Sequence, residues 1–595
     1  MTLVPSPRTE HRRPGQLTVP ADATIALRGT ARDAVADLPA ELRAVTGLPL
    51  AEAAGDAFIT VSVAEPCRPS RYRIKIESNG IEVAGGDRAG AFYGLQQVLK
   101  LLVAAPDRRT LPLLEVADEP AMAVRGVMID AGRRFWSPRT LRALVRDLAW
   151  WHGNRLQLHL TEWNGFRVRL SDERFSGLAT EPAYTSAEIR DLIGYARKWH
   201  VELVPEIDLP AHATAMIEQR PSLRFADGGG GAPLNDGSYF TGGPTPSWTV
   251  DITKAANRQW LRDLVSAFGS ELDPVAVHLG ADEWPPESEM AGCAELSGYA
   301  TGLDPAYNAT DAMVHTVNDL ASVVRAQGRR AEIWNWWEHA SKGEFRLWPD
   351  RDTVVTAWPD DPSQLGWFTA AGYRVVASPA TTHYVTPRTY PGNRPTTNYV
   401  VADPRWLYET WHPDERMDGY QLCVWSDWAE EQPDEYFLAF AHRPLQAMLD
   451  RCWGGARRRD ADAFFDAVDA TARDRGPDRL LGTGQFTTLP PDATLTRIRF
   501  RPIRRLTGSA AGNSGKWTAA DHAALDALVG TVFTGFGPDG AVPLGRVDTP
   551  PSGVWTQLSV GAVPVRRVSC DRPMDVQWYG FIEAQRPSVD APVNQ

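Results

Sequence analysis

Cysteine is scarce in this 595-residue chain and never occurs as a CxxC pair. The five cysteines are odd in number and widely spaced, so the sequence predicts neither a disulfide framework nor a zinc site. They are expected to be buried free thiols, at positions Cys67, Cys293, Cys423, Cys452 and Cys570.

Long apolar runs are also missing. No segment reaches the 18 apolar residues that a membrane-spanning helix needs. The first 17 residues carry charge and proline where a signal peptide needs an apolar core. The sequence therefore predicts a cytoplasmic protein with no membrane partner.

Runs of basic residues and glycine-rich phosphate loops are absent as well. The net charge is −12, and acidic and basic residues are interspersed along the chain. Nucleic acid is therefore not an expected partner. We expect no cofactor and no bound metal, and nothing in the sequence indicates an oligomeric state.

Tryptophan, in contrast, is abundant, with 22 residues in the chain, about twice the usual share. Indoles stack on the C–H faces of sugar rings, so a tryptophan-rich cleft favours a carbohydrate as the partner. Tryptophan is also a common core residue, and its abundance alone does not decide between the two interpretations.

Composition and pattern divide the chain into four parts. Residues 1–15 are polar and contain proline, and are expected to be disordered. Residues 16–120 mix alternating strand patterns, at 59–63 and 72–76, with a helical pattern at 89–102, which predicts a small α+β domain. Residues 456–595 contain short strand patterns and are expected to form a β-rich C-terminal accessory region.

The fold class predicted for residues 121–455 is a (β/α)8 barrel. Eight short apolar runs read as buried parallel strands, and most are followed by an amphipathic helix. An open doubly wound sheet is the alternative, but it requires a glycine-rich turn after its first strand. The sequence GVMIDAGRRFW at the first strand contains no such turn. The eight runs are GVMID from 126, RLQLHL from 155, VELVPEI from 201, VAVHLG from 275, AEIWN from 331, TVVTAW from 353, YRVVA from 373 and YQLCVW from 420.

Polar and aromatic side chains gather where these strands end, which is the face that carries the active site of a barrel. Strand four ends HLGADEW and so places Asp282 and Glu283 side by side. The side chains of neighbours diverge, so this pair cannot flank one glycosidic bond as an opposed acid and nucleophile. Adjacency favours a substrate-assisted reaction, in which the 2-acetamido oxygen of the sugar attacks its own C1.

Four segments in register resemble the family 20 glycoside hydrolases, the β-N-acetylhexosaminidases. HLGADE at 278–283 resembles the family's H-x-G-G-D-E, and VPEIDLPAHATAMI at 204–217 resembles its PEIDxPGH segment. The segment from 125 to 168 resembles the stretch that holds the family's sugar-binding arginine and its H-x-H-L-x-D-D run. The fourth, YRIKIESNGIEVAGGDRAGAFYGLQQVLKLL at 72–102, resembles the end of the family's N-terminal domain.

This resemblance implies removal of terminal N-acetylhexosamine with retention at C1. It implies that Asp282 orients the acetamido group and that Glu283 is the general acid and then the base. A relay of Asp208 and His212 would tune Glu283. The sugar itself would be held by Arg133, Glu162, Trp334, Trp358, Tyr384, Trp425 and Asp427.

The chain also departs from the family pattern. Ala281 replaces the second glycine of the motif, a mild change if its φ is negative. Glu162 replaces an aspartate, and Gln157 and Trp163 are further substitutions in the same run. Thr386 stands where the family has an aspartate. Because Thr386 and Asp427 alter contacts to the outer hydroxyls, we expect an atypical sugar specificity.

Three alternatives stay open. The chain is either an active hexosaminidase, a catalytically impaired sugar-binding homologue, or a barrel glycosidase that uses its own nucleophile. His159 and His278 are expected to be core histidines rather than metal ligands. The glycine-rich loop from 226 to 248 is expected to be a surface insertion, with gating of the substrate as the alternative.

Overall fold

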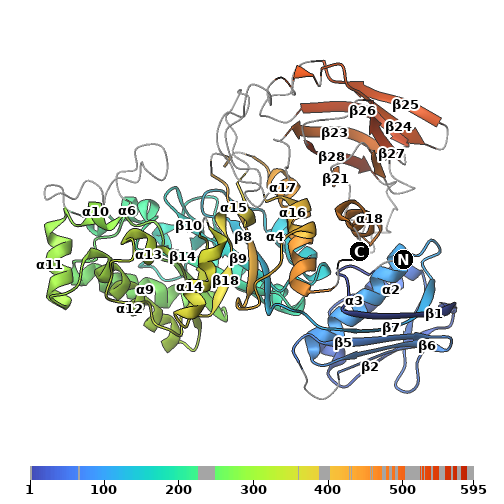
Figure 1. Ribbon diagram of the computed structural model, residues 1–595, viewed down its shortest axis with the longest axis horizontal. Helices are drawn as coiled ribbons and strands as arrows, with labels where there is room; N and C mark the ends of the chain where they lie inside the picture. Colours follow the sequence, from blue (N-terminus) through green and yellow to red (C-terminus); the bar gives the residue numbers. More distant parts are fainter. Residues whose placement is uncertain are drawn as a thin grey trace.

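The structure is a computed structural model of the full chain (Figure 1). The described residues are 3–63, 68–225, 248–359, 361–386, 402–427, 429–430, 432–455, 457, 460–471, 478–481, 486–488, 494–502, 523, 526–527, 529–537, 540–548, 556–564, 567–571 and 578–585. The loop at 226–247 and the segment at 387–401 lie outside them.

The N-terminal domain is a seven-stranded mixed sheet in the order β1-β7-β5-β6-β4-β2-β3. The long helix α3 (Arg88–Ala104) begins at Asp87, whose side chain accepts a hydrogen bond from the Gly90 N–H, and packs against β4, β5, β6 and β7. The other elements are β1 (Thr9–Thr18), β2 (Thr24–Arg28), α1 (Ala31–Ala34), α2 (Leu38–Thr46), β3 (Ala51–Glu52), β4 (Ile59–Val63), β5 (Tyr72–Glu77), β6 (Gly80–Gly85) and β7 (Thr110–Asp118).

The expectation that residues 1–15 are disordered is wrong. Strand β1 pairs antiparallel with β7, with Thr9 opposite Ala117 and Thr18 opposite Thr110. Its side chains are largely exposed, as expected of an edge strand. The polar composition gave no strand signal, because β1 is an edge strand that pairs with a segment about a hundred residues away.

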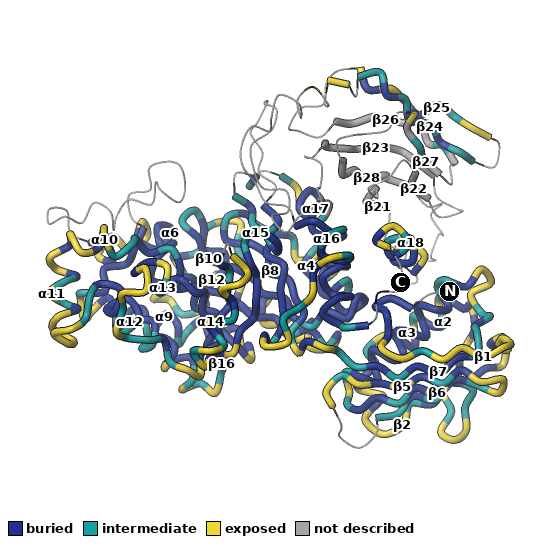
Figure 2. The backbone as a smooth tube through the Cα atoms, in the orientation of Figure 1, coloured by how far each residue is buried: buried dark blue, intermediate teal, exposed yellow. Residues whose placement is uncertain are grey.

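Eight parallel strands close into a barrel, as predicted, and all eight overlap the predicted runs. The order is β18-β17-β16-β15-β14-β9-β8-β20, and pairing of β18 with β20 closes the ring. The strands are almost wholly buried, whereas the exposed residues lie on the surrounding helices and loops (Figure 2). The strands are β8 (Val124–Asp130), β9 (Arg155–His159), β14 (Glu202–Leu209), β15 (Ala276–Gly280), β16 (Arg330–Trp334), β17 (Val354–Ala357), β18 (Val375–Ala377) and β20 (Gly419–Val424).

Helices surround this barrel, and two begin at the predicted caps. Ser137 caps α4 (Pro138–Trp150) with Pro138 in the first turn, and Thr185 forms a capping box with Glu188 at α5 (Ser186–Lys198). The remaining helices are α6 (Thr214–Gln219), α9 (Ala255–Leu272), α10 (Glu287–Met290), α11 (Ala294–Leu303), α12 (Ala309–Ala326), α13 (Trp336–Ala340), α14 (Leu365–Ala370), α15 (Ala380–His383), α16 (Pro404–Glu409) and α17 (Asp434–Trp453).

The region after the barrel begins with α18 (Ala461–Thr471), which contacts α3 and α16. Two four-stranded sheets follow, in the orders β21-β28-β23-β26 and β22-β27-β24-β25 (Figure 1). The strands are β21 (Asp478–Leu481), β22 (Phe486–Thr488), β23 (Thr494–Pro502), β24 (Val532–Gly537), β25 (Gly540–Arg546), β26 (Thr556–Pro564), β27 (Arg567–Cys570) and β28 (Trp578–Gln585).

Three cysteine thiols are described, and their state matches the prediction. Cys293, Cys423 and Cys452 are free and buried. Within the described residues, no helix is both long and apolar enough to cross a bilayer.

Candidate active site

Strand register lines up a row of polar residues inside the barrel. Asp130 on β8 pairs with His159 on β9, His159 with Glu206 on β14, and Glu206 with His278 on β15. Partners in register point to the same face of a sheet. The barrel therefore carries these side chains together into its interior, just below the strand ends, where all four are buried.

The acidic pair sits on a turn with unusual backbone geometry at the end of β15. Gly280, Ala281 and Glu283 all have positive φ, of 67°, 66° and 48°. A Cβ on Gly280 would lie 1.9 Å from Asp208 Oδ1, so only glycine fits there. The turn directs Asp282 into the buried interior, while the side chain of Glu283 stays 27% exposed.

The backbone of Ala281 does not meet the condition under which its replacement of glycine would be mild. Its φ is positive rather than negative, because its N–H must point at Asp208 Oδ1, 3.1 Å away. A residue with a Cβ is strained in this left-handed region, by about 1–2 kcal/mol relative to glycine. The replacement of glycine by alanine is therefore not a neutral change.

We expect Ala281→Gly to raise the free energy of unfolding by about 0.5–1 kcal/mol, because glycine relieves the strain. Urea denaturation measures the change. Ala276→Gly is the matched control, since Ala276 is equally buried but lies in strand β15 without a positive φ. That control should lose stability, and equal losses in both variants would contradict the account.

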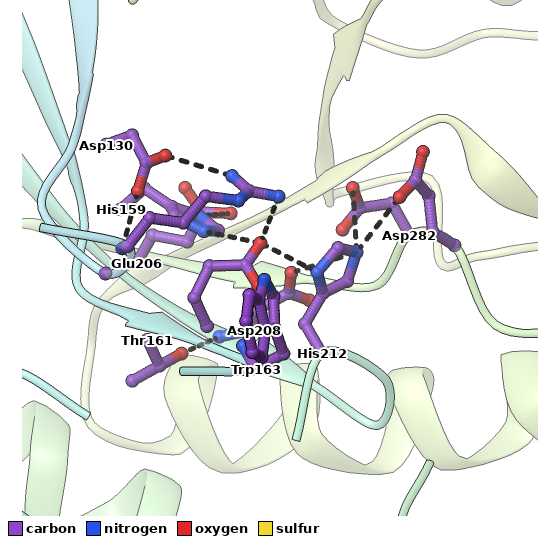
Figure 3. Close-up of polar contacts among 12 residues, drawn as sticks. Asp130, His159, Thr161, Trp163, Glu206, Asp208, His212 and Asp282 are labelled. Atoms are coloured by element: carbon purple, nitrogen blue, oxygen red, sulfur yellow. Dashed lines mark hydrogen bonds and ion pairs between the residues drawn. The ribbon is translucent and has the colours of Figure 1, made fainter. Parts of the chain in front are cut away.

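His212 stands at the centre of the site (Figure 3). Its Nδ1 lies 2.7 Å from Glu162 Oε1. Its Nε2 faces Glu283 Oε2 at 3.4 Å, Asp282 Oδ2 at 3.9 Å and Asp208 Oδ2 at 4.0 Å. The nearest carboxylate behind His212 is thus Glu162, and the predicted pairing with Asp208 is the longest of the four contacts.

Asp208 supports the turn rather than the imidazole. Its N–H donates to Thr161 Oγ1 at 2.7 Å, and its Oδ1 accepts the N–H of Ala281. Both contacts hold the end of β14 against the neighbouring strand and against the acidic turn. Asp208 therefore fixes where Asp282 lies.

Arg133 is held by three carboxylates. Its Nη1 lies 3.0 Å from Asp130 Oδ2, and its Nη2 lies 2.6 Å from Glu162 Oε1 and 3.7 Å from Asp427 Oδ1. The guanidinium also lies over the Trp425 ring, 5.2 Å from its centroid. Glu162, one methylene longer than aspartate, thereby contacts both Arg133 and His212.

Burial and charge together set the protonation of the site. Burial opposes the charge on His212, but Glu162, Asp208 and Asp282 outweigh it and raise the pKa of His212 well above its ordinary value. Burial also opposes the charge on Glu162, but Arg133 and His212 hold its pKa well below its usual range. The shifts favour the charged form of both groups, which form an ion pair.

The two aspartates behave in the opposite way. Burial raises the pKa of Asp282 to about 7, with Glu283 and Glu206 adding to the effect and His212 opposing it. Burial also raises the pKa of Asp208 well above its ordinary value, and the nearby Asp282 raises it further. Asp282 therefore titrates near neutral pH in the free protein.

Aromatic rings line the other side of the site. Trp334 is buried, and Trp358, Tyr384 and Trp425 pack against its cluster, as the predicted indole box requires. Trp425 lies 6.0 Å from Trp334 and 5.9 Å from Tyr384, between ring centroids. Thr386 is buried directly after β19 (Tyr384–Val385).

Two further residues, which the sequence did not assign to the site, belong to it. Trp336 stacks on Trp358 at 5.9 Å with nearly parallel rings. Trp248 packs against the His212 ring at 4.4 Å and donates its indole N–H to the Glu283 carbonyl at 2.8 Å. Trp248 is the last residue of the glycine-rich segment from 226 to 248, and that segment was its only signal in the sequence.

Two groups of side chains in the described part of the chain come close enough to share one ion. They are His159, Glu206 and Asp208, and Asp208, His212 and Asp282. Each imidazole in these groups already faces carboxylates inside the protein, at 3.0 Å for His159 and 2.7 Å for His212. Internal ion pairs account for the donor atoms, and we assign no metal.

We therefore expect dialysis against EDTA to leave kcat unchanged within error, because protein groups alone neutralise these charges. Activity on a chromogenic glycoside before and after dialysis measures this. A loss that a divalent metal restores would contradict the assignment.

The fold and the arrangement of carboxylates, imidazole and indoles at one barrel face place the chain among the glycosyl hydrolases. Its residues 123–454 match the model of glycosyl hydrolase family 20, catalytic domain, and residues 1–119 match domain 2 of the same family. The chain belongs to glycosyl hydrolase family 20.

Similar proteins carry consistent names. A β-hexosaminidase of Porphyromonas gingivalis is 31% identical over 191 residues, which cover 29% of this chain and 25% of that protein. An N,N'-diacetylchitobiase of Vibrio harveyi is 30% identical over 250 residues, covering 36% and 28%. The chain thus spans about a quarter of the length of these two curated relatives.

Solved structures share the fold at lower identity. The β-N-acetylhexosaminidase of Bacteroides fragilis superposes with a TM-score of 0.65 at 18% identity, covering 79% of this chain and 94% of that one. The family 20 β-N-acetylhexosaminidase of Streptomyces coelicolor A3(2) gives 0.62 at 20% identity, with the same coverage.

Proposed function

We propose that the chain is an exo-acting, retaining β-N-acetylhexosaminidase that uses the acetamido group of its substrate as the nucleophile. The observation that carries the proposal is the adjacency of Asp282 and Glu283 on one turn, where Asp282 is buried and Glu283 is partly exposed. Adjacent carboxylates cannot supply an enzymic nucleophile opposite the acid. The names of its relatives and the complex of a Vibrio harveyi homologue with N-acetylglucosamine support the sugar class.

In the first step the acetamido oxygen forms a bond to C1 while the bond from C1 to the leaving oxygen breaks. Glu283 donates its proton to that oxygen, and Asp282 accepts the acetamido N–H and balances the positive charge of the oxazolinium. In the second step water attacks C1, the bond from C1 to the acetamido oxygen breaks, and Glu283 takes a proton from the water. Two inversions at C1 give retention.

His212 assists this cycle through charge. It faces Glu283 at 3.4 Å and is held by Glu162 on its other nitrogen. A protonated imidazole stabilises the carboxylate that Glu283 becomes after it has given up its proton. Arg133 has a separate role: it hydrogen-bonds the sugar hydroxyls, and Asp427 lies beside it.

We propose in addition that the preferred sugar is not the commonest one. Thr386 carries no charge where an aspartate would bind the outer hydroxyls. Asp427 stands where the resembled family usually has a glutamate, and its side chain is one methylene shorter. Both changes leave the acetamido contacts untouched. The protein should therefore discriminate less between sugars that differ at the outer hydroxyls, while it still requires the acetamido group.

A panel of 4-nitrophenyl glycosides tests both statements. The expected result is hydrolysis of N-acetylhexosaminides, including 6-substituted ones, with inhibition by a thiazoline analogue of the oxazolinium. Binding of the thiazoline without turnover of any glycoside would instead establish a sugar-binding homologue. Covalent trapping by a fluorosugar would establish an enzymic nucleophile.

A further inference from the structure

A second carboxylate–imidazole pair lies directly behind Glu162. His159 Nε2 is 3.5 Å from Glu162 Oε1, and His159 Nδ1 is 3.0 Å from Glu206 Oε1. The contacts form one chain, from Glu206 through His159, Glu162 and His212 to Glu283. Figure 3 labels Glu206, His159 and His212. Acidic and imidazole groups alternate along it.

The inner end of this chain is rigidly held. Glu206 accepts the indole N–H of Trp334 at 2.7 Å on one oxygen and the Gln157 amide at 2.7 Å on the other. His159 and Glu206 are paired in strand register, and both are buried. Neither can reorient without disturbing barrel packing.

We propose that His159 and Glu206 are positioning residues that extend the His212 relay, holding the charge and orientation of Glu162 from behind. This inference rests on the proposed function and names two further residues for the same reaction. His159 touches no substrate atom in this scheme. It acts only through Glu162 and His212.

The charges around His159 agree with this role. Asp130 on β8, Glu162 on β10 (Thr161–Glu162), Glu206 and Asp208 on β14, and His278 on β15 face it. Burial opposes its charge, but the carboxylates outweigh burial and raise the pKa of His159 well above its ordinary value. Burial likewise opposes the charge on Glu206, but His159 and His278 bring its pKa down to about 2.

His278, the other buried histidine beside Glu206, does not share the raised pKa of His159. Burial lowers the pKa of His278 to about 4, although the same Glu206 lies 3.5 Å from it. Its Nδ1 accepts the N–H of Gly280 and its Nε2 lies 3.3 Å from Thr356 Oγ1, so it makes no link toward Glu162. Two buried imidazoles on one carboxylate therefore hold different charges.

Two isosteric substitutions separate the two contacts of His159. In His159→Asn the amide overlays Nδ1 and keeps the contact with Glu206, whereas in His159→Gln it overlays Nε2 and keeps the contact with Glu162. Both remove the charge. We expect kcat to fall about tenfold in His159→Gln and about a hundredfold in His159→Asn.

The pH profile of kcat/KM distinguishes loss of the His159 charge from a packing defect, because a packing defect would not shift the profile. Loss of a positive charge disfavours deprotonation of nearby acids, so both limbs should shift to higher pH by about half a unit or more. Glu206→Gln removes a negative charge and also weakens the positive charge that Glu206 holds on His159. The two effects oppose each other, so the limbs should shift by less than in His159→Gln.

The matched control is His152, which is fully buried outside the site between Tyr93 and Trp453. His152→Asn and His152→Gln should lower Tm and leave the pH profile unmoved. The relay is refuted if the His159 variants do the same, or if Asn and Gln at 159 behave alike in kcat.

The same variants separate this inference from the proposed function. A wild type that hydrolyses N-acetylhexosaminides while its His159 variants keep the normal pH profile refutes the relay alone. If the wild type shows no turnover, the pH dependence of thiazoline binding, followed by the shift in Tm, replaces the rate. A protein that neither hydrolyses the glycosides nor binds the thiazoline refutes both.

Discussion

Glu283→Gln is expected to lower kcat about a thousandfold on a substrate with a poor leaving group, because Glu283 is the acid that protonates the departing oxygen in the proposed reaction. The loss should shrink to about tenfold on a 2,4-dinitrophenyl glycoside, whose leaving group departs without a proton. Steady-state kinetics on the two substrates measures the ratio. Thiazoline affinity should change little, since the acetamido contacts remain.

Glu289→Gln is the matched control for this variant. Glu289 is an exposed glutamate on α10, six residues along the same segment, and its loss should leave kcat unchanged. An equal loss on both substrates would show that Glu283 is not the general acid. Full activity in Glu283→Gln would overturn the assignment of the acidic pair.

Asp282→Asn is expected to lower kcat by about a hundredfold to a thousandfold, because an amide cannot balance the developing oxazolinium charge. Unlike Glu283→Gln, it should impair the hydrolysis of both substrates alike, since the acetamido oxygen must attack C1 whichever leaving group departs. It should also weaken thiazoline binding. The leaving-group ratio thus separates the roles of two neighbouring residues.

The same substitution should stabilise the fold above neutral pH. Asp282 keeps its proton up to about pH 7 in the folded protein, where burial raises its pKa, but loses it near pH 4 when unfolded. Wild-type stability therefore falls as pH rises from 4 to 7, and Asn escapes that loss. We expect Asp282→Asn to gain about 1–2 kcal/mol at pH 8 and nothing at pH 4.

Urea denaturation at the two pH values measures this gain. Asp22→Asn, at an exposed aspartate of the N-terminal domain, is the control and should not change stability at either pH. A gain of the same size at both pH values would show that charge burial is not its cause. A loss at pH 8 would contradict the account of Asp282 altogether.

The sequence predicted the barrel well because its signals are local. Each strand is a short run of buried residues, so its pattern can be recognised without knowing its partners. The caps at Ser137 and Thr185 likewise depend on residues three positions away. Strand ends then indicated the face on which the polar residues meet.

Features that depend on distant partners were missed. Strand β1 is polar and pairs with β7, about a hundred residues away, so no local apolar pattern marked it. The positive φ of Ala281 follows from the position of Asp208, on a different strand. Neither the pairing of β1 nor the φ of Ala281 can be predicted from the residues next to it in the sequence.

The candidate site shows the same division. Asp282, Glu283 and His212 were predicted from motif and place, and the structure brings them together. The closer partner of His212 is Glu162 rather than Asp208, because the longer glutamate side chain reaches Nδ1. Distances between side chains on different strands depend on tilt and register, which pattern alone does not specify.

Participation of the acetamido group is the central claim, and one rate series tests it most directly. Fluorination of the acetyl methyl withdraws electrons from the carbonyl oxygen without changing C1 or the leaving group. The account predicts that kcat/KM falls steeply from N-acetyl through N-fluoroacetyl to N-trifluoroacetyl glucosaminides, by about a thousandfold overall, because a poorer nucleophile attacks more slowly. Rates that stay within a factor of two across the series would contradict it.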